Sequence, residues 1–360
     1  MNSPISATPA RIALLGCGAV SELYHAPALL QLEKEGIAKL VAVFDPDTAR
    51  AKRFCAGFPA AIAYSDEAFL QKTPLDLAIV ASPVSSHETH AVRALEAGIA
   101  VLCEKPLAAN AESGDRMIAA ALKHRRVLAV GLLRRFYSNV QFTRRLIQNK
   151  TLGNVRSFSI QEGGTFNWPA RSDSFFRKET AGGGVLLDLG VHVLDLVVNW
   201  FGEPQQLSYT DDAMGGIETN CRLELSYTAG FKGTIQLSRD WDTSSRYVIE
   251  FERGTLRLRA GEAEKVELEC NDFSVQGLLK KQAGHTTATA TTFPHAFLAQ
   301  LRDVISAVRT SGQPLVPGEE GIRSLRLIEQ CYRTRSLMEM PWLSPEEKKA
   351  SELLAAGGQR

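Results

Sequence analysis

The chain has 360 residues, of which 44% are apolar and 22% are charged, with a formal net charge of +1. This length exceeds one ordinary hydrophobic core and predicts two domains. The charges are scattered, so the sequence offers no broad basic surface for nucleic acid or anionic lipid. The start, MNSPISATPA, lacks a basic segment followed by an apolar run, and no stretch has the length of a membrane span. We therefore expect a folded cytoplasmic protein without nucleic-acid or membrane partners.

The six cysteines are dispersed along the chain and show no CxxC or zinc-type spacing. Most of them stand inside apolar runs, which predicts small core residues in a reducing compartment. Cys17 and Cys103 flank motifs described below, but neither has a neighbouring histidine or helix pattern that would favour a thiolate.

Residues 1–132 alternate between short apolar runs and helical patterns. Strands buried on both faces of a parallel sheet are predicted at RIALLGCG, KLVAVFD, LDLAIVAS, IAVLCEK and RVLAVGLL. Helices are predicted at SSHETHAVRALEAG, which ends at Gly98, and at NAESGDRMIAAALKHRR, which begins at the N-cap candidate Asn110. The first domain is therefore predicted to be a doubly wound α/β domain.

Residues 133–360 change to short strands of alternating polarity, which favours an open, mainly antiparallel sheet. The predicted strands are NVRSFSIQE, QQLSYTDD, CRLELSYT, KGTIQLSR, RYVIEFE, TLRLRA and KVELE. Helices predicted to cover one face are GVLLDLGVHVLDLVVNWFG, HAFLAQLRDVISAVRTSG and EEGIRSLRLIEQCYRTRS, and a polar terminal helix is expected at LSPEEKKASELLAAGGQR. We expect alternating residues such as Phe158 and Ile160, or Ile235 and Leu237, not all to fit in one core, so the second face would carry an oligomer contact.

The stretch GCGAVS, residues 16–21, follows the first strand and opens a helix, as a dinucleotide-binding loop does. Gly16 would form the tight turn, and Gly18 would let a pyrophosphate approach the helix N-terminus. Ser21 stands where the third glycine of the pattern is expected. At the end of the second strand, Asp45 favours NAD because a carboxylate accepts ribose hydroxyls and repels a 2′-phosphate. Arg50 leaves room for NADP, and an ordinary strand–turn–helix is the alternative interpretation.

The stretch DLGVHVLD places Asp188, His192 and Asp195 on one helical face. The surrounding helix is otherwise almost wholly apolar, so its polar side chains are expected to be buried and to need partners. A zinc site built on these three residues is the alternative. It is disfavoured because no cysteine or second histidine nearby completes a ligand set, and no metal ion is expected.

With these motifs the chain resembles the Gfo/Idh/MocA family, named for glucose–fructose oxidoreductase and inositol dehydrogenase. The resemblance is carried by the nucleotide loop, ASPVSSHETHAVRALEAG, CEKPL, GGGVLLDLGVHVLD and RDVISAVRTSGQPLV. Ser21 and Val84 depart from the family pattern, which often has asparagine where this chain has Val84. The resemblance implies a Rossmann domain, then an α/β domain whose open sheet makes homodimer or homotetramer contacts. It also implies NAD(P)-dependent oxidation of a sugar or cyclitol ring hydroxyl, or reduction of the ketone.

Matched by motif, the resemblance makes Lys105 the catalytic lysine and Asp188 and His192 the catalytic pair. Whether Lys105 or His192 is the immediate proton acceptor stays open. A lysine that only snorkels from a strand end is the structural alternative. The cofactor contacts expected are Gly16, Gly18, Ala19, Val20, Asp45, Ser82, Pro83, His87, Glu104 and Lys105. The substrate contacts expected are Lys105, Arg135, Trp168, Asp188 and His192, with Asn167, Arg171 or Asp173 as hydroxyl-binding candidates in a loop that could equally be plain surface.

Two other functions remain open for this sequence. The same groups could support a redox-neutral lyase or glycosidase that oxidises its substrate transiently and then returns the hydride. The fold could also serve a nucleotide-sensing regulator without catalysis. Lys105, Asp188 and His192 argue against the regulator, because a sensor has no need of proton chemistry.

Overall fold

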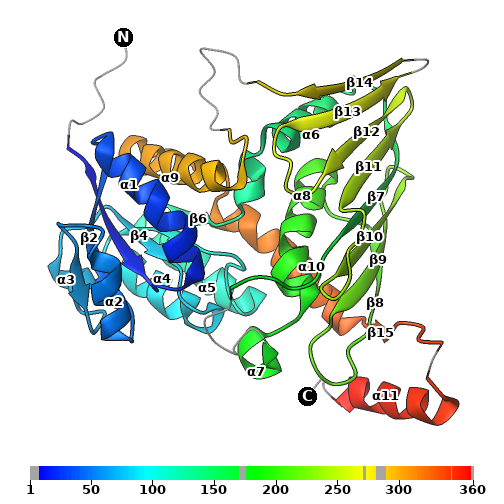
Figure 1. Cartoon of the computed structure of the whole chain (residues 1–360), viewed down its shortest axis with the longest axis horizontal. Coiled ribbons are helices and arrows are strands. Elements are labelled where there is room, and N and C mark those ends of the chain that lie inside the picture. The colour runs from blue at the N-terminus through cyan, green and yellow to red at the C-terminus, as the bar shows by residue number, and fades with distance from the viewer. Residues whose placement is uncertain (1–7, 170–175, 271–272, 281–288, 342, 358–360) are drawn as a thin grey trace. The chain divides into compact units, whose positions relative to one another are not determined.

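The structure, a computed structural model, describes residues 8–169, 176–270, 273–280, 289–341 and 343–357 (Figure 1). It divides the chain into two compact units, Met1–Phe136 with Thr286–Arg323, and Tyr137–His285 with Ser324–Arg360. The chain first passes from one unit to the other after Phe136, close to the division predicted after residue 132. The division differs from the single boundary predicted, because residues 286–323 belong again to the first unit. The last change of unit, after Arg323, falls within helix α10, Gly318–Arg333.

The first unit is built on a six-stranded sheet with the order β3-β2-β1-β4-β5-β6, in which every pairing is parallel. This arrangement confirms the predicted doubly wound sheet. The short strand β3 was not predicted, because it has three residues and begins with an exposed isoleucine. The strands are β1 Ala10–Leu15, β2 Ala38–Phe44, β3 Ile62–Tyr64, β4 Leu77–Val80, β5 Ala100–Cys103 and β6 Leu128–Val130.

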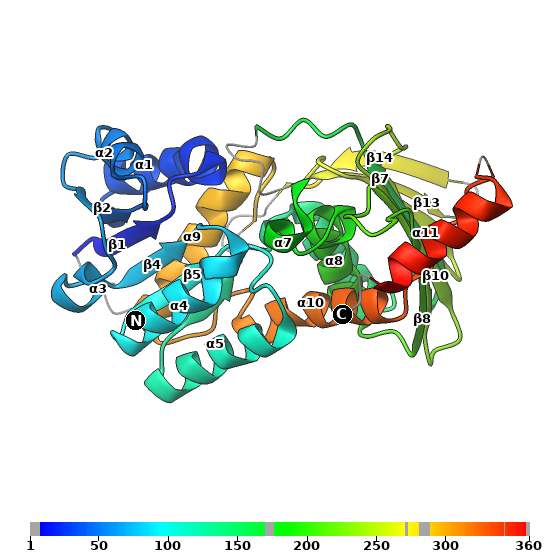
Figure 2. The same ribbon diagram turned by 90° about the horizontal axis from the view of Figure 1, so that it is seen from below.

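The helices of the first unit begin and end largely at the residues that the sequence indicates. Asn110 caps α5 by accepting a hydrogen bond from the backbone N–H of Ser113, and Gly98 follows α4 with a φ of 77°. Figure 2 shows α4 and α5 side by side. The helical segments before residue 137 are η1 Ser21–His25, α1 Ala26–Lys34, α2 Thr48–Cys55, α3 Phe69–Lys72, η2 Val84–Ser86, α4 His87–Glu96, α5 Ala111–His124 and η3 Leu133–Phe136.

Helix α9, Phe293–Thr310, belongs to the first unit, so the prediction that it covers the second sheet was wrong. It packs against α1, and the two helices lie side by side in Figure 1. The ring of Phe297 stacks on Tyr24 at 5.0 Å between centroids, and Gln300 donates a hydrogen bond to the carbonyl of Val130. An amphipathic pattern shows that a helix has an apolar face but does not identify the surface it covers.

The second unit is built on a nine-stranded sheet with the order β14-β13-β12-β11-β7-β10-β9-β8-β15. The β7–β10 and β8–β15 pairings are parallel and the others are antiparallel, which confirms the mainly antiparallel prediction. Strands β14 and β15 were not predicted. The strands are β7 Val155–Gly163, β8 Gln206–Asp211, β9 Asn220–Ser226, β10 Lys232–Ser238, β11 Arg246–Phe251, β12 Gly254–Arg259, β13 Lys265–Cys270, β14 Phe273–Leu278 and β15 Ser336–Leu337.

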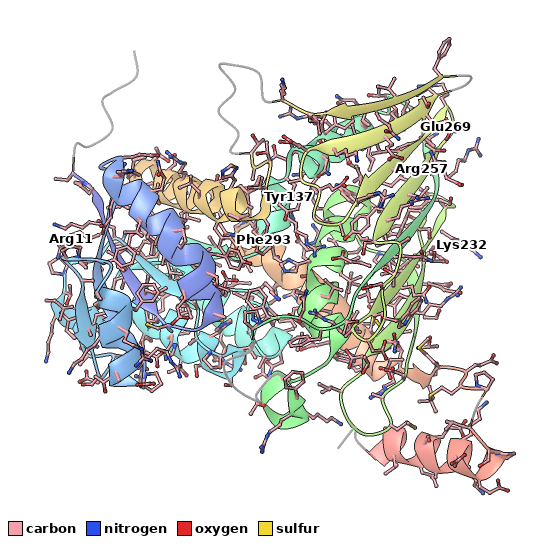
Figure 3. The ribbon with its side chains drawn as sticks, in the orientation of Figure 1. Arg11, Tyr137, Lys232, Arg257, Glu269 and Phe293 are labelled. Carbon is pink, nitrogen blue, oxygen red and sulfur yellow. The ribbon has the colours of Figure 1, made fainter. Side chains whose placement is uncertain are left out.

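One face of this sheet forms the core of the second unit. Phe158, Ile160, Ile235 and Leu237 are all buried on that face, so the expectation that one core could not hold them was wrong. The alternate positions form the open face, where most side chains are polar. Figure 3 labels Lys232, Arg257 and Glu269 there, and the last two form an ion pair of 2.7 Å between neighbouring strands.

Helices α6 and α8 lie on the buried face of the sheet (Figure 1). The indole of Trp200 in α8 donates a hydrogen bond to the carbonyl of Val140 in α6 and joins the two helices. The helical segments of this unit are α6 Ser138–Gln148, α7 Lys178–Ala181, η5 Leu186–Gly190, α8 Val191–Phe201 and α11 Pro345–Gly357. In the described part of the chain, no helix has the length and apolarity needed to cross a membrane.

The centre of the second sheet depends on a glycine beneath an aromatic ring. Gly233 on β10 pairs with Phe158 on β7, and a Cβ on that glycine would lie 2.0 Å from the Phe158 ring. The ring also stacks on Phe201 with 4.7 Å between centroids. Only the absence of a side chain at residue 233 leaves space for the ring.

Replacing Gly233 with alanine should therefore lower the free energy of unfolding by about 1–3 kcal/mol, because the ring must leave its site. Urea unfolding followed by tryptophan fluorescence measures this change. Thr234→Ala, one residue further on and on the open face, is the matched control and should cost less than about 1 kcal/mol. Equal effects of the two substitutions would contradict this packing.

Candidate active site

The glycine loop after β1 has the backbone that a dinucleotide needs. Gly16 has a φ of 101°, and a Cβ on it would lie 2.6 Å from the carbonyl oxygen of Ala81 at the end of β4. Only glycine fits both conditions. A Cβ on Gly18 would meet nothing within 4 Å, so the space beside that residue is open. This space lies before the helix that begins at Ala19 and Val20, where a pyrophosphate would receive backbone N–H groups.

Ser21 explains how the loop tolerates the loss of the third glycine. Its side chain is fully buried, and its hydroxyl donates a hydrogen bond of 2.7 Å to the carbonyl of Gly16. The serine therefore ties the first turn of the helix back to the loop. The π-helical turn η1 begins at this serine.

Asp45 follows β2 and is 3% exposed. Its Oδ2 accepts the backbone N–H of Cys17 at 2.9 Å, and its Oδ1 accepts that of Asp47 at 2.9 Å. Arg50 lies 3.6 Å from the same carboxylate. The carboxylate is therefore held at the glycine loop, and since each oxygen has a second lone pair it can also accept ribose hydroxyls. The loop and the carboxylate together fit a nicotinamide dinucleotide.

The segment after β4 is fixed by two buried histidines. The hydroxyl of Ser82 lies 2.8 Å from Nδ1 of His90, and the ring of His87 lies 2.9 Å from the carbonyl of Ser82 and 3.0 Å from that of Pro106. Burial lowers the pKa of His87, so the neutral ring donates to one of these carbonyls. His87 thus joins the Ser82–Pro83 segment to the peptide after Lys105, and its contact with a cofactor stays a prediction.

Lys105 lies at the same sheet edge as the glycine loop. Leu15 at the end of β1 pairs with Val80, and Val80 pairs with Cys103 at the end of β5, so the residues that follow all three strands meet there. Lys105 is half-buried, and Glu104 before it is buried. Ligands of open α/β sheets bind at this edge.

In the second unit, Asp188 lies in the π-helical turn η5, and His192 lies in the first turn of α8. The buried Glu218 holds the start of this segment, because its Oε1 accepts the backbone N–H groups of Gly184 and Leu186 at 3.0 Å each. A Cβ on Gly184 would lie 1.9 Å from the carbonyl oxygen of Glu218. Gly184, the last glycine of the GGG run before the helix, is therefore required by close approach of the backbone.

Arg239 is a functional candidate that the sequence analysis missed. Its guanidinium forms an ion pair with Asp188, and both side chains are 25% exposed. The guanidinium also lies 5.4 Å from the centroid of the Phe166 ring. Arg239 follows β10, about fifty residues after Asp188 in the chain, and no local pattern marks that pairing. The sequence contains one signal, which is that a carboxylate on an apolar helix needs a partner.

The remaining predicted residues have different environments. Arg135 is buried, and its guanidinium lies 3.4 Å from Glu320 of the same unit, so this contact is structural and its substrate contact stays a prediction. His192 and Asp195 are buried, and Trp168 is half-buried. The candidates Arg171 and Asp173 lie outside the described residues.

The described ranges contain no group of three histidine, cysteine, aspartate or glutamate side chains that could hold a metal ion.

Comparison with known proteins identifies the family. Residues 10–132 match the oxidoreductase family with an NAD-binding Rossmann fold, and residues 140–257 match the GFO/IDH/MocA C-terminal domain. D-glucoside 3-dehydrogenase of Escherichia coli is 32% identical over 57% of this chain and 57% of its own length. The scyllo-inositol 2-dehydrogenase (NADP(+)) IolW of Bacillus subtilis is 24% identical over 90% of this chain and 93% of its own.

Among solved structures, the aldose-aldose oxidoreductase of Caulobacter crescentus matches with a TM-score of 0.78 and 23% identity, over 91% of this chain and 97% of its own. This match shows the fold. The chain belongs to the GFO/IDH/MocA family, and its first unit is the NAD(P)-binding Rossmann domain of an oxidoreductase.

Asp45 should set the choice of cofactor. Asp45→Ser should raise the Kd for NAD about tenfold or more, because charge-assisted hydrogen bonds of about 1.5–3 kcal/mol are lost, and should lower the Kd for NADP by relieving charge repulsion. Titration of the protein's fluorescence with each cofactor measures both constants. Asp47→Asn keeps the cap of α2 and removes a charge beside Arg50, so it should leave NAD binding nearly unchanged. A wild-type protein that already prefers NADP would refute this interpretation of Asp45.

Proposed function

We propose that this protein is an NAD(P)-dependent dehydrogenase that transfers a hydride between the nicotinamide and a ring hydroxyl or ketone of a sugar or cyclitol. One observation carries the proposal. The dinucleotide loop and Lys105 meet at a single edge of the parallel sheet. The names of the relatives, a glucoside dehydrogenase and an inositol dehydrogenase, support a polyhydroxylated ring as the substrate.

Lys105 is the residue that we assign to the reacting oxygen. The bound nicotinamide supplies the hydride acceptor or donor. A hydride leaves an alcohol carbon only as the hydroxyl proton is removed, and in the reverse direction the developing alkoxide needs a hydrogen-bond donor. Lysine can serve both roles because its ammonium donates and its amine accepts a proton.

Asp188 and His192 are assigned as the second group of catalytic residues. His192 is the acid or base at the hydroxyl, and Asp188 orients the substrate or the proton-carrying groups. The ion pair with Arg239 supports this role for Asp188, because it fixes the position of the carboxylate. Trp168 is retained as a candidate for stacking on the face of a sugar ring.

The redox-neutral lyase or glycosidase remains the second candidate, since the same residues could oxidise a hydroxyl transiently and then return the hydride. The stoichiometry of the cofactor separates the two functions. A dehydrogenase forms one reduced nicotinamide for each product, whereas a lyase turns over without net reduction. A nucleotide sensor is disfavoured by the presence of Lys105, Asp188 and His192.

We also propose a cytoplasmic homo-oligomer whose contact uses the C-terminal sheet. The edge strand β14 supports this contact, since Phe273, Val275 and Leu278 on it are 77%, 62% and 59% exposed. All six cysteines are free thiols, which suits a reducing compartment. The partners proposed are a small polyhydroxylated substrate and a second copy of the chain.

A panel of aldoses, sugar acids, glycosides and inositols tests the function directly, with NAD or NADP and absorbance at 340 nm as the readout. We expect stoichiometric cofactor reduction with at least one class. Lys105→Met should reduce turnover with that substrate at least about a hundredfold, the lower scale for losing a positioned acid or base. Binding of NAD should be retained, because methionine keeps most of the bulk of the lysine stem. Lys123→Met on the exposed surface of α5 is the control and should keep full activity. Near-normal turnover of Lys105→Met would return this lysine to a structural role.

Light scattering at micromolar concentration should show a dimer or tetramer. Val275→Lys should shift the mass towards the monomer, because it places a charge on the apolar edge strand. Leu122→Lys changes a side chain that is 66% exposed on α5 in the first unit, and it should leave the mass unchanged. A monomeric wild-type protein would exclude the oligomer.

A further inference from the structure

His25 and Glu104 form a buried pair beside the proposed catalytic lysine. His25, at the end of the π-helical turn η1, is fully buried, and its Nε2 lies 2.8 Å from Oε1 of Glu104. Glu104 directly precedes Lys105 and is 7% exposed. The pair joins residues 79 positions apart in the chain, at the edge where the dinucleotide loop lies.

The hydrogen-bond geometry assigns the proton of the histidine. Nδ1 of His25 has no hydrogen-bond partner among the described residues. A buried N–H without an acceptor costs more than an unused lone pair, so the proton resides on Nε2 and is donated to Glu104. The His25 ring also packs against the ring of Phe297 in α9 in an edge-to-face arrangement, with 5.1 Å between centroids.

The carboxylate of Glu104 has little freedom to move. A Cβ on Gly131 would lie 2.7 Å from its Oε2, so the carboxylate occupies the space that this glycine leaves. The backbone N–H of Glu104 is bonded to the carbonyl of Val80. Its Oε2 accepts the backbone N–H of Lys105 at 3.2 Å. One carboxylate oxygen therefore accepts a hydrogen bond from His25, and the other accepts one from the backbone N–H of Lys105.

The buried carboxylate and the lysine influence each other electrostatically. Burial alone would raise the pKa of Glu104, but its contacts with His25, and then with Lys105, outweigh that effect and lower the pKa. The other titratable neighbours are His87, whose pKa is lowered by burial, and Cys103, whose pKa is raised by burial. At neutral pH both are uncharged, whereas the Glu104 carboxylate carries a negative charge that acts on the Lys105 ammonium.

We propose that His25 is a positioning residue that acts on Lys105 through Glu104, by fixing the buried carboxylate beside the lysine. The inference rests on the proposed role of Lys105 in catalysis, because it assigns His25 a function in the same reaction. Without the histidine, the buried carboxylate loses its donor and takes up a proton, since an unpaired buried charge is costly. The lysine then loses its negative neighbour and its protonated form is less stable.

The pH dependence of Lys105 acetylation by acetic anhydride, followed by mass spectrometry, tests this without any substrate. The midpoint is the pH at which Lys105 acetylation reaches half of its maximal rate. In His25→Leu this midpoint should fall by about one pH unit relative to wild type. His25→Gln retains an N–H donor and should restore most of the wild-type midpoint. Phe297→Leu removes ring packing against the same histidine but keeps its hydrogen bond, so it should leave the midpoint unchanged. An equal fall in Phe297→Leu and His25→Leu, or no fall in the latter, would overturn the proposal.

Glu104→Gln provides a second test should His25→Leu fail to fold. It removes the charge and keeps the shape, so the midpoint should fall as in His25→Leu. The double variant His25→Leu/Glu104→Gln should show no further fall, because both changes act through one carboxylate. Additive falls, or an unchanged midpoint in Glu104→Gln, would contradict the inference.

With a substrate from the panel, His25→Leu should lower kcat about tenfold or more, while the Kd for NAD changes less than about threefold. If no substrate is turned over, the proposed function fails, but the acetylation midpoints still decide the role of His25. A fall in kcat without a change of midpoint would reject action through Glu104.

Discussion

The first unit depends on one constraint of parallel sheets, which is that the carboxyl ends of neighbouring strands meet at one edge. Every polar group that leaves those strands must find a partner there, because the strands are buried on both faces. Ser21 therefore bonds to Gly16, Asp45 accepts the N–H of Cys17, and Glu104 accepts His25. The same contacts that satisfy these groups orient the loop for a dinucleotide and the backbone before Lys105. The hydrogen bonds of these buried polar groups and the geometry of the proposed active site are therefore consequences of a single arrangement of strands.

In the second unit, the buried polar groups that need partners lie on an apolar helix. Its polar residues Asp188 and His192 lie where a π-helical turn joins α8, and Glu218 holds the start of that segment through two backbone N–H groups. π-Helical turns are rare and often mark functional positions. The turn that carries His25 and the turn that carries Asp188 are both of this kind.

The sequence was sufficient to predict the elements whose signal is local. Continuous apolar runs predicted five strands of the first sheet, alternation predicted seven of the second, and the loop pattern predicted Gly16, Gly18 and Asp45. Contacts between distant residues were beyond it. No pattern shows that Arg239 pairs with Asp188, that His25 pairs with Glu104, or that α9 returns to the first unit, because these depend on which surfaces the folded chain brings together. The expectation that Phe158, Ile160, Ile235 and Leu237 exceed one core was wrong for a similar reason, since alternation does not tell how many apolar residues one core can hold.

Transfer of deuterium tests the central claim, direct hydride transfer to the nicotinamide, most directly. The measurement uses a substrate carrying deuterium on its ring carbons and follows the mass of the reduced cofactor. Direct transfer predicts one deuterium atom in the nicotinamide of each reduced cofactor. With an unlabelled substrate in heavy water, the reduced cofactor should contain no deuterium. Reduced cofactor that acquires its hydrogen from solvent, or product that forms while the cofactor stays oxidised and the deuterium stays in the sugar, would contradict it.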